Sequence, residues 1–83
     1  MNDYEPVLSS KALVTLLNLE KRKQQKLSNI LFQLASFPHQ KGDYSLNDES
    51  GREIQYILVG NYVIGFWPEH STNELRIVEI DLV

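Results

Sequence analysis

Apolar and polar residues alternate along the first part of the chain in a way that predicts a short strand followed by a short helix. Residues 4–8 (YEPVL) are typical of a strand, and Pro6 restricts that strand to a sheet edge because proline cannot donate a ladder hydrogen bond. Ser9 or Ser10 can cap a helix, which we expect to run from Ser10 to Asn18. Its apolar positions at helical spacing are Leu13, Leu16 and Leu17.

A second helical stripe follows the polar segment NLEKRK, which predicts a break or tight bend. Its apolar positions follow the i, i+3, i+4, i+7 spacing of an amphipathic helix: Leu27, Ile30, Leu31 and Leu34. Pro38 ends this helix, because the residue before a proline avoids the helical region. We expect the two helices to form an antiparallel hairpin whose apolar stripes face one sheet.

The remainder of the chain favours strands. Residues 38–52 are rich in turn formers and predict a long loop with a short strand around Tyr44–Leu46. Gly60-Asn61 is a hairpin signal between two apolar runs, and residues 68–73 predict a loop. The three strands are expected at residues 53–59, 62–67 and 74–83, and the shared face of the last strand holds Val78, Ile80 and Leu82.

The predicted fold is therefore α+β, with the order β-α-α-β-β-β and a helical hairpin on one face of a small antiparallel sheet. Both faces of the strands at 53–59 and 62–67 are apolar, so both should be covered. The helices cover one face, and we expect a protein partner on the other. Phe66 and Trp67 point to opposite faces, and the second aromatic is covered either by a partner or by the loop after Pro38.

Composition narrows the class of protein. The chain has 83 residues, which predicts a single domain spanning 1–83. It has no cysteine and only two histidines, so we predict neither a metal nor a cofactor. No apolar run approaches the roughly 20 residues that span a bilayer, and the first ten residues are polar and acidic. These features predict a soluble, cytoplasmic protein with no membrane partner.

Charge is unevenly distributed along the chain. The net charge is −3, yet residues 1–41 carry six Lys and Arg against three Asp and Glu, whereas residues 42–83 carry two against eight. A protein that binds nucleic acid broadly usually has a basic surplus, so the acidic balance disfavours RNA or the ribosome as partner. Four cations (Lys21, Arg22, Lys23 and Lys26) are expected at the bend between the helices, as a solvated turn or, alternatively, a nucleic-acid contact.

The sequential order of four segments resembles the RelE/ParE superfamily of type II toxin–antitoxin toxins. PVLSSKALVTLLNL is similar to the opening strand and helix of that family, and KLSNILFQLASFP to its second helix. GREIQYILVGNYVIGFW is similar to the central strands around a Gly-x-Tyr turn, and ELRIVEID to the last strand. The resemblance implies a small toxin neutralised by an antitoxin that wraps it. RelE-like members cut messenger RNA on the ribosome, and ParE-like members poison DNA gyrase.

The chain differs from the nuclease members at positions that carry their chemistry. Val63 follows the turn tyrosine where arginine is usual, and the sequence ends at Val83, where those members continue into a basic segment. RNA cleavage needs groups that activate the 2′-OH, protonate the leaving oxygen and neutralise the phosphate. We therefore expect a toxin-like component that acts by binding a cellular target and an antitoxin. The alternatives are a ribosome-dependent or free mRNA endonuclease and a non-toxic interaction module.

Candidate site residues follow from these hypotheses. An endonuclease would use Arg52, His70 and Arg76 in place of the usual site. His70 lies between Glu69 and Glu74 and could act as a general base, or simply lie on a surface loop. Arg52 could bind a phosphate or carboxylate, or pair with Asp48 or Glu49 to order the turn before it. The residues expected to bind a partner, an antitoxin or a second copy, are Tyr44, Arg52, Tyr62 and Trp67.

Overall fold

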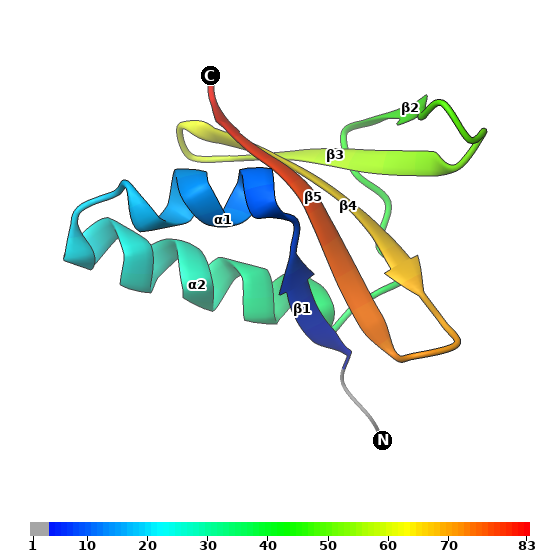
Figure 1. Cartoon of the computed structure of the whole chain (residues 1–83), viewed down its shortest axis with the longest axis horizontal. Helices are drawn as coiled ribbons and strands as arrows, with labels where there is room; N and C mark the ends of the chain where they lie inside the picture. The colour runs from blue at the N-terminus through cyan, green and yellow to red at the C-terminus, as the bar shows by residue number, and fades with distance from the viewer. Residues whose placement is uncertain (1–3) are drawn as a thin grey trace.

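A computed structural model describes residues 4–83 and confirms the predicted order of elements (Figure 1). The short strand expected around Tyr44 is present and is one residue longer than predicted. None of the helices described in residues 4–83 is long and apolar enough to cross a membrane. The elements are β1 (Glu5–Leu8), α1 (Ser10–Leu17), α2 (Lys21–Ala35), β2 (Tyr44–Asn47), β3 (Glu53–Val59), β4 (Tyr62–Glu69) and β5 (Glu74–Leu82).

The five strands form one sheet in the order β1-β5-β4-β3-β2. β1 runs parallel to β5 and the other neighbours are antiparallel, so the sheet is mixed and the prediction of an antiparallel sheet is wrong at this pairing. No turn joins β1 to β5, so the sequence around Pro6 carries no local signal of strand direction. β1 has a single neighbour, which confirms the edge position expected from Pro6.

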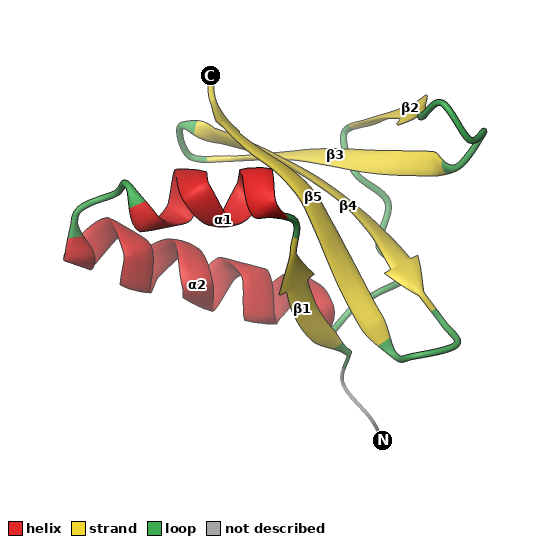
Figure 2. Cartoon of the chain, viewed as in Figure 1, coloured by secondary structure: helices red, strands yellow, loops and turns green. Residues whose placement is uncertain are grey.

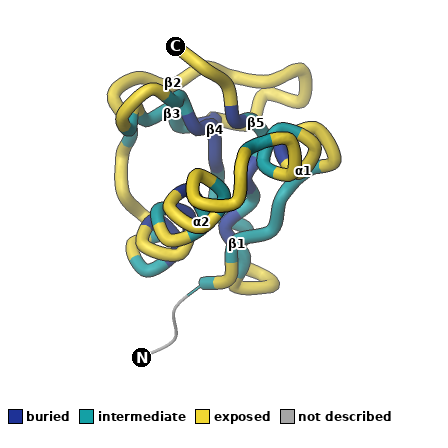
Figure 3. Tube along the Cα trace, turned by 90° about the vertical axis from the view of Figure 1, so that its left-hand side faces the viewer, coloured by how far each residue is buried: buried dark blue, intermediate teal, exposed yellow. Residues whose placement is uncertain are grey.

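Both helices lie on one side of the sheet, as Figure 2 shows, and α2 presents the predicted stripe to it. Leu27, Leu31 and Leu34 are buried there in the same core cluster as Ile64 and Phe66 of β4. In Figure 3 the buried segments gather where the helices meet β4 and β5. The amphipathic spacing of this helix is therefore satisfied by one face of the sheet.

The stripe predicted for α1 is only partly correct. Leu16 packs against the core, but Leu13 and Leu17 are 43% and 61% exposed, and Ala12 is fully buried in their place. The cause lies at the N-cap. Ser9 accepts a hydrogen bond from the Ala12 N–H at 3.1 Å and donates one to the Val78 carbonyl at 3.1 Å, which fixes the first turn of α1 on β5. The small Ala12 side chain allows this close approach.

Three further details differ from prediction. The cations Lys21, Arg22, Lys23 and Lys26 lie in the first two turns of α2 and not at a bend. Pro68 and Glu69 extend β4 and do not belong to the following loop. A β-bulge in β5 leaves Val78 without a pairing partner, because Phe66 pairs with Ile77 and Gly65 pairs with Glu79.

The bulge also changes which residues of β5 reach the core. Ile77 and Ile80 are both buried, at 0% and 2% exposure, although a regular strand would place them on opposite faces. The prediction that Val78 shares a face with Ile80 and Leu82 is therefore wrong.

Candidate functional site

The side of the sheet away from the helices brings together three of the predicted site residues. Phe66 is buried under the helices, so its neighbour Trp67 points to the opposite face, as the alternation predicts. Trp67 pairs with Arg76 of β5, and Arg76 pairs in turn with Val7 of β1. Arg52, just before β3, places its guanidinium carbon 3.9 Å from the centre of the Trp67 ring.

Trp67 is thus covered by Arg52, the last residue of the loop predicted at residues 38–52, so this loop supplies one of the two predicted covers. A guanidinium stacked on an indole ring is held by the negative face of the ring as well as by contact. Because Arg52 is still 45% exposed at its side chain, its N–H groups remain able to bind an anion.

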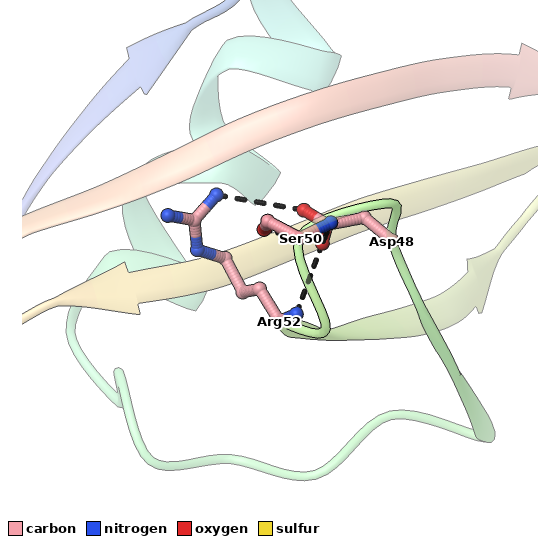
Figure 4. Close-up of polar contacts among 3 residues, drawn as sticks. All are labelled: Asp48, Ser50 and Arg52. Atoms are coloured by element: carbon pink, nitrogen blue, oxygen red, sulfur yellow. Dashed lines mark hydrogen bonds and ion pairs between the residues drawn. The ribbon is translucent and has the colours of Figure 1, made fainter.

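A tight turn holds Arg52 in this position (Figure 4). One carboxylate oxygen of Asp48 accepts hydrogen bonds from the Ser50 N–H, the Ser50 hydroxyl and the Arg52 N–H, at 2.9, 2.7 and 2.9 Å. The other oxygen lies 3.5 Å from Nη1 of Arg52, so the predicted ion pair with Asp48 is present. The Ser50 hydroxyl and then the Arg52 N–H lower the pKa of Asp48, because they bond to its charged form.

We expect Ser50→Ala to raise the pKa of Asp48 towards its ordinary value, since the largest cause of the lowering is removed. Because the pKa of Asp48 is lower in the folded state than in the unfolded state, the charged carboxylate stabilises the folded protein at pH values above the unfolded pKa of 3.8. That stability is lost as the pH falls through the folded value. Carboxyl NMR titration of both proteins measures the shift, and an unchanged Asp48 pKa in the variant would show that Ser50 is not its main partner.

Arg76 contributes the second guanidinium of this face. Its Nη2 lies 2.8 Å from Oε1 of Glu74, whereas its Nε is buried and has no hydrogen-bond partner among residues 4–83. A pocket of about 250 Å³ lies here, lined by Val7, Leu8, Ser9, Arg52, Trp67, Arg76, Ile77 and Val78. Two guanidinium groups beside one aromatic ring are suited to a carboxylate or phosphate group.

The third endonuclease candidate, His70, belongs to a different cluster. It follows β4, where its Nδ1 is joined to the Tyr4 hydroxyl by a hydrogen bond of 2.7 Å. The ring of His39 stacks on it with centroids 5.0 Å apart. Residues 4–83 contain no group of three or more His, Asp or Glu side chains that could hold a metal ion.

The aromatic candidates divide between the two sides of the sheet. Tyr44 stacks on Tyr56 of β3 with centroids 5.1 Å apart, and 47% of Tyr44 is exposed. Tyr62 pairs with Leu82 and packs against the core on the helix side, away from Trp67.

Sequence reasoning did not single out Tyr56 or Asp48 as site residues. The sequence did hold a signal for Tyr56, namely a glycine within a strand, which often marks the close approach of another group. In the structure the Tyr56 ring lies over this residue, Gly65 of the paired strand, where a Cβ would come within 2.8 Å of Cε1 of the tyrosine. Burial and then Glu79 raise the pKa of Tyr56, so its hydroxyl stays protonated at neutral pH. Tyr56 is therefore a neutral aromatic platform beside Tyr44.

Comparison with known proteins supports the fold. No family model matches the chain, and no curated protein matches it in sequence. A chain in the crystal structure of the toxin–antitoxin complex RelBE2 from Mycobacterium tuberculosis superposes with a TM-score of 0.79 and 19% identity, over 100% of this chain and 94% of that chain. The chain therefore has a RelE/ParE-like fold, as the order of its motifs predicts.

Proposed function

We propose that this protein is the toxin-like component of a type II toxin–antitoxin pair and acts by binding a cellular target and a cognate antitoxin in the cytoplasm. The observation that carries the proposal is the match over the whole chain to a protein found in a toxin–antitoxin complex. The order of the sequence motifs supports the same assignment independently of the superposition.

The face formed by Arg52, Trp67 and Arg76 is the proposed working surface for the target. Arginine and tryptophan are the residue types most enriched among the energetically dominant contacts of protein interfaces. The adjacent Tyr44–Tyr56 stack adds apolar area with few rotatable bonds. A carboxylate or phosphate of the target would bind between the two guanidinium groups.

Messenger RNA cleavage is disfavoured as the activity. The pocket beside Arg52 and Arg76 has two cations that could neutralise a phosphate, but none of its described lining residues is a His, Lys, Tyr, Asp or Glu that could move a proton. The Ser9 hydroxyl already bonds to Val78 and Ala12, and His70 bonds to Tyr4. Glu79 and Asp81 on the same side of β5 also lower the positive charge that RNA requires.

A growth assay tests the proposal. The protein is expressed from a tightly controlled bacterial promoter beside Arg52→Ala/Arg76→Ala and a matched control, Arg22→Ala, which removes an exposed arginine of α2. We expect the parent and the control to stop growth and the double variant to lose at least tenfold in toxicity, measured by colony counts. Circular dichroism establishes that all three proteins are folded.

The other outcomes are equally informative. If the double variant stops growth as strongly as the parent, the protein is toxic but the Arg52–Arg76 face is not its working surface. If no form affects growth and no antitoxin copurifies from the native host, the chain is a non-toxic interaction module with this fold.

A further inference from the structure

One row of cross-strand neighbours on the side of the sheet away from the helices combines aromatic rings with a carboxylate. Tyr44 of β2 pairs with Tyr56 of β3, and Tyr56 pairs with Gly65 of β4. Gly65 pairs in turn with Glu79 of β5. We call these residues the tyrosine row and this side of the sheet the open side. The row crosses neighbouring strands over about 14 Å, at the ~4.8 Å spacing of strands.

The glycine of the row brings Tyr56 and Glu79 together. A Cβ at Gly65 would lie 2.8 Å from Cε1 of Tyr56 and 3.4 Å from Cβ of Glu79, so both side chains border the space that the glycine leaves. The Tyr56 ring lies in that space, and the Tyr44 ring stacks on it with the two planes 6° apart. Because Tyr44 is 47% exposed, the row presents an aromatic surface to solvent and a carboxylate at its other end.

The charge of the open side favours a basic partner. Strand alternation and register place five acidic residues on it: Glu5, Glu69, Glu74, Glu79 and Asp81. The arginines of this side, Arg52 and Arg76, already form ion pairs with Asp48 and Glu74. No lysine follows Lys41 in the sequence. The open side therefore has a net negative charge, which attracts cationic groups.

An arginine side chain suits both halves of the tyrosine row. A guanidinium stacks on aromatic rings and donates paired hydrogen bonds to a carboxylate, whereas the compact ammonium of lysine has no plane to stack. Arg52 already stacks in this way on Trp67, on the same side of the sheet. Burial and then the charge of Glu79 raise the pKa of Tyr56, which places this carboxylate near the tyrosine side chain.

We propose that the tyrosine row binds an arginine from a basic, extended segment of the target protein, with its guanidinium on the tyrosine rings and its N–H groups on Glu79. The inference deepens the proposed function and rests on it only in taking the bound protein to be the target. An extended chain advances ~3.3 Å per residue, so four or five residues cross the row. Basic residues beside the arginine then meet the other carboxylates of the open side.

The probe is a fluorescein-labelled peptide of alternating arginine and threonine, and fluorescence anisotropy measures its binding to the full-length protein. We expect micromolar affinity, with the largest amide NMR shifts at Tyr56, Gly65 and Glu79. Glu79→Gln should weaken binding about tenfold, because a charge-assisted hydrogen bond is lost. The matched control Glu20→Gln removes the same charge from an exposed residue before α2 and should leave binding unchanged.

Substitutions of Tyr44 test the stacking. Tyr44→Ala should weaken binding about fivefold and Tyr44→Phe by less than about twofold, because the contact needs the ring and not the hydroxyl. Circular dichroism establishes that each variant is folded. A lysine–threonine peptide should bind about fivefold more weakly than the arginine peptide. Equal affinity of the two peptides would overturn the proposal, and so would binding that is insensitive to Glu79→Gln.

A single-stranded RNA is the alternative ligand of an aromatic surface. We expect it not to bind, because the open side is acidic. RNA binding that Tyr44→Ala abolishes would overturn the proposal, since a base would then stack where we place an arginine. Failure of the growth assay with peptide binding intact would remove the toxin role and leave this inference standing. Full toxicity of Glu79→Gln despite lost peptide binding would overturn the choice of the target as the bound protein.

Discussion

Phe66→Ala is expected to lower the free energy of unfolding by about 3–5 kcal/mol. Phe66 is fully buried between β5 and the helices, and it is the largest of the fully buried side chains. Truncating such a residue removes about 3–5 kcal/mol of stability. A domain of this size has roughly 4–12 kcal/mol in total, at ~0.05–0.15 kcal/mol per residue. The loss therefore removes at least about a quarter of the free energy of unfolding, and all of it if the protein lies at the lower end of this range.

Urea titration followed by circular dichroism measures this loss. Phe32→Ala is the matched control, because the same truncation is made in α2 at a side chain that is 62% exposed. Its free energy of unfolding should change by no more than about 0.5 kcal/mol. Similar losses in the two variants would contradict the assignment of Phe66 to the core.

Gly42→Ala should have the second largest effect on stability. A Cβ at Gly42 would overlap the backbone carbonyl of Tyr56, which belongs to a strand and cannot move aside. The Gly42 N–H also donates to Oε1 of Gln55 at 2.8 Å, so the segment before β2 lies directly against β3. We expect a loss of at least about 1–3 kcal/mol, the usual range for overpacking.

Hydrogen exchange at the Asp43 and Leu58 amides shows whether the segment has separated from β3. Both amides should exchange faster in Gly42→Ala, because their bonds to Tyr56 and Asp43 depend on this close approach. Lys41→Ala, one residue earlier and exposed, should change neither stability nor exchange. A stable Gly42→Ala protein with unchanged protection would show that the segment does not pack this closely.

Sequence periodicity predicted the elements whose signals are local. The stripe from Leu27 to Leu34 identified α2, and Gly60 at φ 59° forms the expected hairpin turn between β3 and β4. Features set by contacts between distant residues were not predictable. The direction of β1 depends on its pairing with β5. The bulge at Val78 shifts the alternation of side chains between the two faces of β5, on which the prediction of a shared face for Val78, Ile80 and Leu82 relied.

The candidate site shows the same division between local and distant information. Pairing of Arg52 with Asp48 spans four residues and was predicted as one reading of the turn sequence. Stacking of Arg52 on Trp67 and the pairing of Trp67 with Arg76 depend on the register of three strands, which composition does not encode. The placement of His70 beside Tyr4 depends on the opposite ends of the chain.

The parallel pairing of β1 with β5 has a consequence for how the protein is made. Ser9 bonds to Val78, 69 residues later, so the first strand has no partner until the ribosome has translated almost all of the described chain. Contacts of such long sequence separation slow folding, because the chain must lose the conformational entropy of loop closure before strand pairing can offset that loss. Val7 and Leu8 line the Arg52–Arg76 pocket together with residues of β5, so the pocket is assembled only when the two ends meet. Incomplete chains would therefore lack the proposed working surface, and any harmful activity would appear only after synthesis is nearly finished.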